Sequence, residues 1–280
     1  MKTTIYTPDS SLRDLSQIPG KIVSDIKAAR ELAWQLALRD IRAQYRQTLL
    51  GFLWAVFPAL ANTAIWLFIQ SAGIVSVQDT ALPYAVYVFS GTILWSAFSD
   101  AVNAPIEKTV AAKPMLAKIN FPHEAIIISG IYQTAFNTVI KAAILIVAAV
   151  LLGITPDWSI VFLPLALLSL IFAGTTIGLA LTPVGLLYTD ISKALPLVMQ
   201  FFMYLTPVVF TIPADGLAKI VFLANPVTPL ITVARDVLTG YPPELLGLFF
   251  SVNLYMLLVI GVMWVVYRAA MPILIERMSA

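Results

Sequence analysis

Residues 160–187 read IVFLPLALLSLIFAGTTIGLALTPVGLL and contain no charged side chain. A helix needs about 20 consecutive apolar residues to cross the hydrocarbon core of a bilayer, so this stretch predicts a membrane-spanning helix. The whole 280-residue chain has the same character, with 60% hydrophobic and 11% charged residues and a mean hydropathy of +0.89. Soluble domains carry about 25% charged residues, so the composition predicts an integral membrane protein.

Five further apolar stretches have lengths suited to spanning helices. The predicted fold class is therefore all-α, a polytopic membrane protein in which residues 1–49 precede a membrane domain at 50–280. The six predicted spans are Gly51–Ile74, Leu82–Val102, Ala125–Gly153, Ile160–Leu187, Ala194–Ile212 and Leu245–Tyr267.

Lys and Arg are unevenly distributed between the two sides of these spans. Short cytoplasmic segments of membrane proteins are enriched in both residues. Residues 1–50 hold eight of them, whereas the segments on the other side hold only Lys219 and Arg235. The segments after the second, fourth and sixth spans hold Lys108, Lys113, Lys118, Lys193, Arg268 and Arg277. Both termini are therefore predicted to be cytoplasmic.

Residues 20–47 are too polar to span but have the pattern of an amphipathic helix. Ile22, Ile26, Ala29, Ala33 and Leu36 recur at spacings of three and four. Such a helix is expected to lie in the membrane interface with its apolar face in the acyl boundary.

The same predicted helix ends in a basic face. Arg39, Arg42 and Arg46 are spaced so that one side of the helix carries three guanidinium groups just before the first span. They are interpreted either as a positive-inside anchor or as a contact for a cytoplasmic partner or an anionic lipid-linked substrate.

The cytoplasmic loop 104–122 is rich in both apolar and basic residues. A loop with apolar residues at near-helical spacing can dock in a groove of another protein, or it can lie on lipid headgroups. The candidate docking residues are Lys108, Lys113, Met115, Leu116 and Lys118.

Segment 211–244, on the opposite side, is too apolar for a free loop and too interrupted by proline to span. Irregular backbone at membrane depth is tolerated only where protein or a wet cavity surrounds it, so a re-entrant helical hairpin is predicted. A hairpin lying flat at the outer interface is the alternative.

The third predicted span carries a polar stripe. Ser129, Gln133, Asn137 and Lys141 recur every four residues and so share one broad helix face. A lysine inside a bilayer costs several kcal/mol unless it faces water, a partner or a cavity, so the stripe is expected to face the protein interior. Together with Asp100 it is a candidate conduit lining, and hydrogen bonding between helices is the alternative role.

Catalytic and nucleotide-binding motifs are missing from the sequence. The chain has no Cys and one His, which excludes cysteine nucleophiles and histidine-rich metal sites. It also lacks the G-x-x-x-x-G-K-[ST] phosphate loop. It is therefore predicted not to be an enzyme, and uphill transport would need energy from a partner or an ion gradient.

Three motifs resemble a known family. Residues 39–54 read RDIRAQYRQTLLGFLW, residues 118–124 read KINFPHE, and NPVTPL at 225–230 precedes Arg235. In these motifs and their order the chain resembles permease subunits of type-two ABC exporters for cell-surface polysaccharides such as O-antigen, capsule and teichoic acid. His123 departs from the family pattern, which has Arg after Phe-Pro.

The resemblance implies a multi-pass permease of the cytoplasmic (inner) membrane. It implies a homodimer that pairs with two nucleotide-binding ABC subunits, which bind ATP and Mg, so this chain itself needs no cofactor and binds no nucleic acid. It further implies a gate helix before the first span, a coupling helix near 105–120, outer re-entrant helices and an undecaprenyl-linked polysaccharide as substrate, all in a bed of membrane lipids. The alternatives are an ABC permease for a small amphipathic substrate or drug and an ion-coupled carrier using Lys141 and Asp100.

Overall fold

The structure is a computed structural model that describes residues 18–46, 48–49, 51–74, 82–116, 122–155 and 157–279. Within these residues every regular element is helical and there is no strand. The α-helices are α1 (Ile18–Tyr45), α2 (Phe57–Ser71), α3 (Tyr84–Ala111), α4 (Lys113–Leu116), α5 (Glu124–Leu151), α6 (Leu163–Leu187), α7 (Thr189–Phe202), α8 (Gly216–Ala224), α9 (Val227–Thr239) and α10 (Leu246–Ser279). Short 3₁₀ helices lie at η3 (Gly51–Ala55), η4 (Trp158–Phe162) and η5 (Met203–Leu205). The predicted all-helical class is confirmed for the described part.

Four helices are long and apolar enough to cross a membrane: α3, α5, η4 with α6, and α10. Helices α8 and α9 meet at 84° and would add a fifth span if counted together. The predicted first and fifth spans correspond to α2 and α7, with 15 and 14 residues, which is shorter than the roughly 20 that a span needs. The count of six spans therefore stays a prediction.

Helix α7 begins at Thr189 and ends at Phe202, earlier at both ends than the predicted span 194–212. The short η5 helix follows it, and the chain then becomes extended at Thr206. Thr206 precedes Pro207, and a residue before proline is driven out of the helical region by the proline ring.

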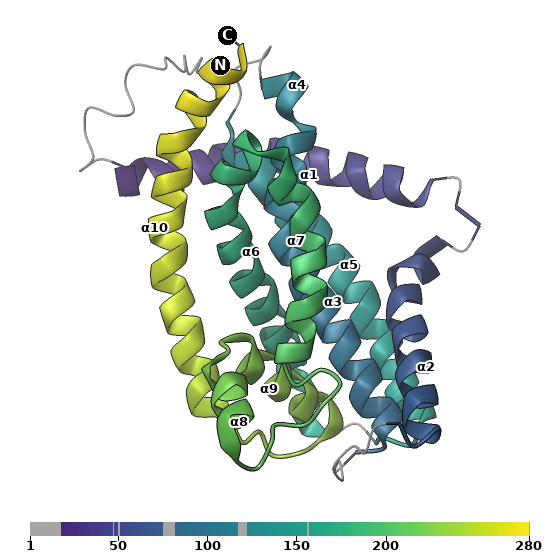
Figure 1. Ribbon diagram of the computed structural model, residues 1–280. Coiled ribbons are helices and arrows are strands. Elements are labelled where there is room, and N and C mark those ends of the chain that lie inside the picture. The colour runs from purple at the N-terminus through teal and green to yellow at the C-terminus, as the bar shows by residue number, and fades with distance from the viewer. Residues whose placement is uncertain are drawn as a thin grey trace.

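Helix α1 crosses one end of the bundle, whereas α3, α5, α6 and α10 run alongside one another (Figure 1). The predicted helix at 20–47 is confirmed. Its face is used differently from the expectation, because Ala29 and Ala33 are fully buried and pack in one cluster with Ile126 and Ile127 of α5. Small side chains let α1 lie directly on protein, where the sequence predicted contact with lipid.

Helix α3 lies at the centre of the bundle and is the most buried of the candidate spans. It continues through Pro105 to Ala111, so the predicted loop 104–122 is helical in its first part. Proline normally breaks a helix because it lacks an N–H and crowds the preceding turn. Here Pro105 is buried against Gly178 of α6, and the helix continues through it.

Glycines on α6 allow α3 and α6 to approach closely. A Cβ at Gly174 would lie 2.6 Å from Ala101 Cβ and 2.7 Å from the Phe98 carbonyl oxygen, and one at Gly178 would overlap the carbonyl oxygen of Val102. Gly174 and Gly178, four residues apart in the sequence, thus mark a contact of backbone on backbone.

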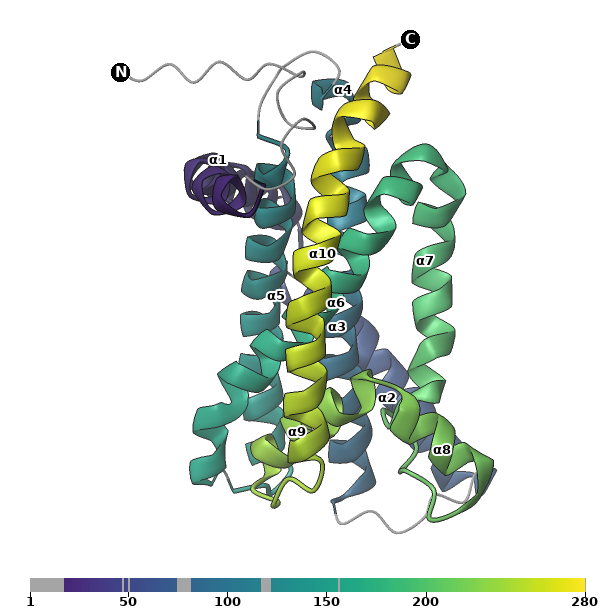
Figure 2. The same cartoon turned by 90° about the vertical axis from the view of Figure 1, so that its left-hand side faces the viewer.

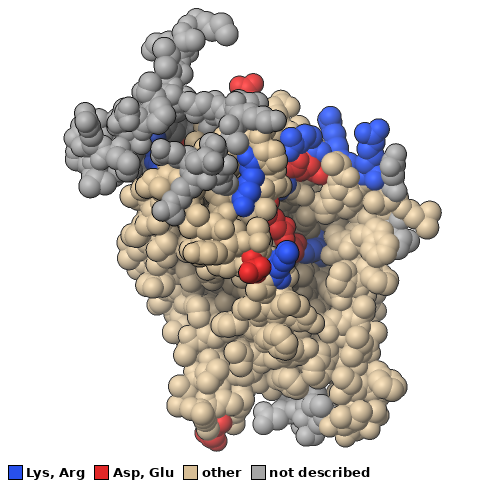
Figure 3. Space-filling view, turned by 45° about the horizontal axis from the view of Figure 1, so that its top comes forward, with Lys and Arg blue, Asp and Glu red and all other residues tan. Residues whose placement is uncertain are grey.

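The two ends of the molecule differ in charge. Most Lys and Arg visible in Figure 3 gather at the end where α1 crosses the bundle, here called the basic end, and the sides below it are almost uncharged. Helices α8 and α9 lie at the opposite end (Figures 1 and 2). The charge distribution matches a molecule that stands upright in a bilayer with α1 at one interface.

The close approach of α3 and α6 predicts that Gly178→Ala destabilises the fold. Forcing a methyl group into a well-packed interface costs about 1–3 kcal/mol, so thermal unfolding in detergent should shift to a lower temperature. Gly261→Ala on α10 is the matched control, because no atom lies within 4 Å of its Cβ position. Alanine is the better helix former, so this control should keep or raise the unfolding temperature. Equal behaviour of the two variants would contradict the packing described for α6.

Candidate functional site

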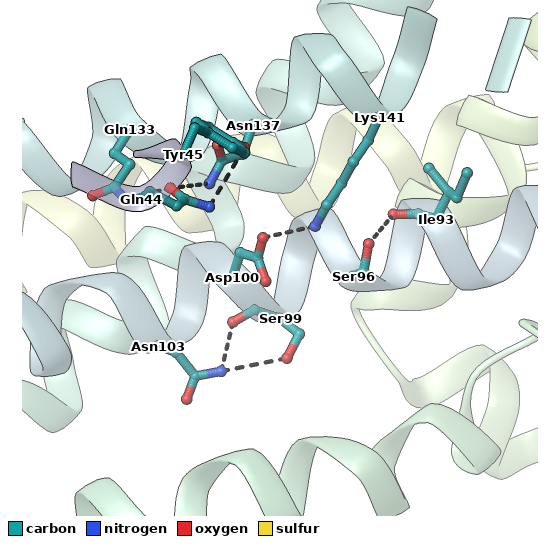
Figure 4. Close-up of polar contacts among 10 residues, drawn as sticks. All are labelled: Gln44, Tyr45, Ile93, Ser96, Ser99, Asp100, Asn103, Gln133, Asn137 and Lys141. Atoms are coloured by element: carbon teal, nitrogen blue, oxygen red, sulfur yellow. Dashed lines mark hydrogen bonds and ion pairs between the residues drawn. The ribbon is translucent and has the colours of Figure 1, made fainter. Parts of the chain in front are cut away.

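The polar stripe of α5 is the first candidate, and the structure places it against α3 and α1. Lys141 is buried, with 5% of its side chain exposed, and its Nζ lies 2.7 Å from Oδ2 of Asp100 on α3 (Figure 4). Asp100 is 43% exposed, so the lysine is the enclosed member of the ion pair. This pairing satisfies the predicted need of a lysine at membrane depth for an opposite charge.

The next two members of the stripe bind the C-terminal end of α1. Gln133 Nε2 donates to Gln44 Oε1 at 2.8 Å, and the hydroxyl of Tyr45 donates to Asn137 Oδ1 at 2.9 Å. Asn137 Nδ2 also donates to Gln44 Oε1, at 3.4 Å (Figure 4). Gln44 and Tyr45 were not predicted as site residues, although they lie between Arg42 and Arg46 of the basic face in the sequence.

Ser129 lies apart from this group. It is buried, and its hydroxyl donates to the Ile126 carbonyl of its own helix at 2.7 Å. Ser129 and Lys141 are thus buried and Gln133 and Asn137 half-buried, and all but Ser129 use their polar atoms in contacts between helices. A conduit role for Ser129, Gln133, Asn137 and Lys141 stays a prediction.

Helix α3 carries a polar face of its own beside the ion pair. Ser96, Ser99, Asp100 and Asn103 are half-buried and Glu107 is exposed, all at spacings of three or four. The donors of this face bond within the helix: Ser96 Oγ to the Ile93 carbonyl at 2.8 Å, and Asn103 Nδ2 to the Ser99 carbonyl at 2.8 Å (Figure 4). Polar groups half-exposed at membrane depth face water or another protein surface rather than lipid. The spacing of these residues is visible in the sequence, whereas their shared exposure beside the ion pair is known only from the structure.

The ion pair between Asp40 and Lys108 ties α1 to the basic end of α3. Asp40 Oδ2 contacts Lys108 Nζ, and each side chain is 19% exposed. Arg39 adds a second contact, 2.8 Å from Asp40 Oδ1. Burial raises the pKa of Asp40, but hydrogen bonds and charge interactions with Lys108 and Arg39 outweigh burial and hold the pKa below its usual value. Lys108 therefore contributes to the anchoring of α1, which the sequence did not predict.

Three of the other candidate docking residues, Lys113, Met115 and Leu116, lie on α4 at the basic end. Lys113 and Met115 are half-buried. Leu116 is 5% exposed and packs in the cluster that joins α1, α5 and α10. Lys118 lies outside the residues that the structure describes. Of the predicted set, Lys113 and Met115 thus keep part of their surface exposed and Leu116 holds α4 to the bundle, and docking to a partner stays a prediction.

The basic face of α1 lines a shallow hollow. Arg39, Arg42 and Arg46 are exposed, as predicted, and with Gln35, Leu38 and Ala43 they surround about 400 Å³. Guanidinium groups bind phosphate and carboxylate groups through paired N–H donors. The chemistry of this hollow suits an anionic ligand. Within the part of the chain that the structure describes, no group of three His, Cys, Asp or Glu residues is arranged to hold a metal ion.

Four of the described helices are long and apolar enough to cross a membrane, which is the architecture of a multi-pass membrane protein. Residues 31–239 match the ABC-2 type transporter family, and the chain belongs to this family.

The chain is similar over most of its length to proteins of polysaccharide export. It is 21% identical over 215 residues to "O-antigen export system permease protein RfbA" of Myxococcus xanthus, which covers 76% of this chain and 82% of the relative. It is 23% identical over 203 residues to the protein of the same name from Klebsiella pneumoniae, covering 71% and 76%. It is 25% identical over 220 residues to "Polysialic acid transport protein KpsM" of Escherichia coli, covering 75% and 82%.

The ion pair predicts an asymmetric response to substitution. Asp100→Asn leaves a buried lysine without its counter-charge and should cost about 3 kcal/mol of stability. Lys141→Met leaves the half-exposed Asp100 and should cost less, about 1 kcal/mol. Denaturant unfolding in detergent measures both, and the double variant should regain most of the loss of Asp100→Asn. If Lys141→Met were the more destabilising change, the assignment of Lys141 as the enclosed partner would be wrong.

Proposed function

We propose that this chain is the permease subunit of an ATP-driven exporter that moves a lipid-linked polysaccharide outward across the cytoplasmic (inner) membrane. The observation that carries the proposal is family membership together with relatives that are named for O-antigen export and polysialic acid transport. In this proposal α2 and α7, extended by η3 and η5, are the first and fifth of six spans. The basic end is cytoplasmic, and so are both termini.

The energy for export would come from a separate nucleotide-binding subunit. Two copies of this chain would pair with two such subunits, which would bind ATP and Mg. Helix α4 is the proposed docking element, because it projects at the basic end with Lys113 and Met115 half-exposed while Leu116 fixes it to the bundle. A rigid attachment is what a coupling element needs, since it must pass on a movement.

The hollow beside Arg39, Arg42 and Arg46 is the proposed contact for the anionic headgroup of the substrate. An undecaprenyl-linked glycan has its phosphate groups at the membrane interface, which is the depth of α1 in this proposal. Charge-assisted hydrogen bonds from arginine are suited to hold such a group.

The proposed sugar path runs along the polar face of α3, formed by Ser96, Ser99, Asp100, Asn103 and Glu107. Sugars are bound and guided by side chains that exchange hydrogen bonds with hydroxyl groups, and half-exposed oxygens on α3 offer such partners. In this arrangement Lys141 does not line the path itself. Its ion pair with Asp100 holds the carboxylate in place.

Co-expression with the nucleotide-binding subunit of the same exporter tests the proposal. A stable complex of two plus two subunits in detergent, with ATP turnover that depends on this chain, is expected. A chain that purifies without an ATPase subunit would favour the ion-coupled carrier.

Within that complex, Lys113→Glu should weaken retention of the ATPase subunit and lower ATP turnover, because it reverses the charge of the proposed docking surface. Lys219→Glu is the matched control, since it reverses an exposed lysine of α8 at the opposite end. Loss of the partner in both variants, or in neither, would remove the docking assignment from α4.

The proposed path predicts that Asn103→Leu lowers export several-fold while ATP turnover and folding are kept. The change replaces a half-exposed amide on α3 with an apolar side chain of similar size. Ser251→Leu on α10 is the control, because Ser251 is exposed and its hydroxyl donates only to Gly247 of its own helix among the hydrogen bonds described. Export is read from the amount of surface polysaccharide in cells lacking the wild-type chain. Unchanged export in Asn103→Leu would exclude this face of α3 as the path.

A further inference from the structure

Arg235 of α9 is a buried cation at the end of the molecule opposite α1, with 3% of its surface exposed. Its Nε donates to Ser90 Oγ of α3 at 3.2 Å, and its Nη2 donates to the Pro207 carbonyl at 2.8 Å and the Val208 carbonyl at 3.3 Å. The guanidinium carbon also lies 3.7 Å from the centre of the Tyr87 ring. One side chain thus joins α9, α3 and the segment that follows α7.

Side chains of other elements supply several of the hydrogen bonds of that segment, residues 206–210. Buried carbonyl and N–H groups outside a helix or sheet need other partners. The Tyr87 hydroxyl donates to the Pro207 and Phe210 carbonyls at 3.2 and 3.0 Å. Asn225 Nδ2 donates to Thr206 Oγ1 at 2.8 Å and to the Leu205 carbonyl at 3.0 Å. The chain just beyond α7 is therefore held on two sides.

Helix α7 itself has few buried residues. Of its residues only Leu195 and Met199 are buried. Figure 2 shows α7 standing apart from α10 along its length. Tyr188 alone joins its N-terminal end to α6, and 206–210 is the attachment of α7 that receives hydrogen bonds from the side chains of α3 and α9.

The two helices beyond that segment also differ. Most of α9 is buried, whereas Phe222 is the single buried residue of α8, where Leu217 and Ile220 are 77% and 65% exposed. Arg235 therefore joins segment 206–210 to α9, the buried helix of the two, and not to α8.

Helix α3 packs tightly against Arg235 and segment 206–210, with no room for a further side-chain atom at Gly91. A Cβ at Gly91 would overlap both Arg235 Nη2 and the Val208 carbonyl oxygen. Arginine suits the position because its planar fork offers several donors and a flat face for the Tyr87 ring, whereas lysine is a point charge without that face.

We infer that Arg235 is the positioning residue that fixes the outer end of α7, so that α7 tilts about this point as the exporter opens and closes. The inference rests on the proposed export function. Under this inference the cytoplasmic end of α7 moves relative to α10, and its outer end keeps its position.

Distances between pairs of spin labels in the complex with the ATPase subunit test the inference. The chain has no cysteine, so cysteines can be introduced without removing any. Phe202 and Leu248 report on the outer end of α7 relative to α10, and Lys193 and Val266 report on the cytoplasmic end; all four side chains are exposed. Between the nucleotide-free and the ATP-trapped state, the Lys193–Val266 distance should change and the Phe202–Leu248 distance should not. A shift of the outer pair as large as that of the inner pair would overturn the inference. Absence of a complex would instead contradict the proposed function.

Variants that loosen the contact provide the second readout. Arg235→Lys keeps the charge, and Tyr87→Phe keeps the ring but loses the hydrogen bonds to Pro207 and Phe210. Both should broaden the Phe202–Leu248 distances and lower export several-fold while ATP turnover continues. Tyr255→Phe on α10 is the control, because Tyr255 is 62% exposed, and it should change none of these values. Narrow outer distances and normal export in Tyr87→Phe and Arg235→Lys would contradict a positioning role.

Discussion

A charge that is removed from water needs a partner that the protein supplies, and three such contacts end on α3 in the part of the chain that the structure describes. Lys108 of α3 binds Asp40 of α1, Asp100 of α3 binds Lys141 of α5, and Ser90 of α3 binds Arg235 of α9. The contacts lie at successive levels along one helix, from the basic end to the opposite end. Because glycines of α6 let its backbone touch α3, the central helix is a rigid axis to which the outer elements are fastened by polar contacts.

This arrangement separates parts that are held from parts that have freedom to move. Helices α1, α5 and α9 are tied to α3, and α4 is tied to the bundle by Leu116. Helix α7 and helix α8 are largely exposed between their attachments. An exporter has to carry a push from its ATPase subunit to a path through the membrane. In the function proposed here, α4 and α3 transmit the conformational change of the ATPase subunit, and α7 is the helix that moves.

The sequence was sufficient for features that depend on local pattern. The apolar runs predicted helices α3, α5, α6 and α10, and the spacing of Ile22 to Leu36 predicted α1. It also placed Lys141 toward the protein interior, because lipid is not an alternative for a lysine. It could not predict which side chain meets which: Asp40 with Lys108, or Arg235 with Pro207, are pairs from distant segments. It placed the end of α3 too early, since Pro105 looks like a helix breaker until its burial against α6 is known.

The most direct measurement follows the glycan. Inverted membrane vesicles, with the cytoplasmic face outward, would carry the complex and a lipid-linked polysaccharide that an added glycosidase can cut from outside. We expect that ATP makes a growing fraction of the glycan resistant to the enzyme until detergent opens the vesicles. If the ATPase subunit turned over ATP at its normal rate while all of the glycan stayed sensitive, export of a lipid-linked polysaccharide by this chain would be contradicted.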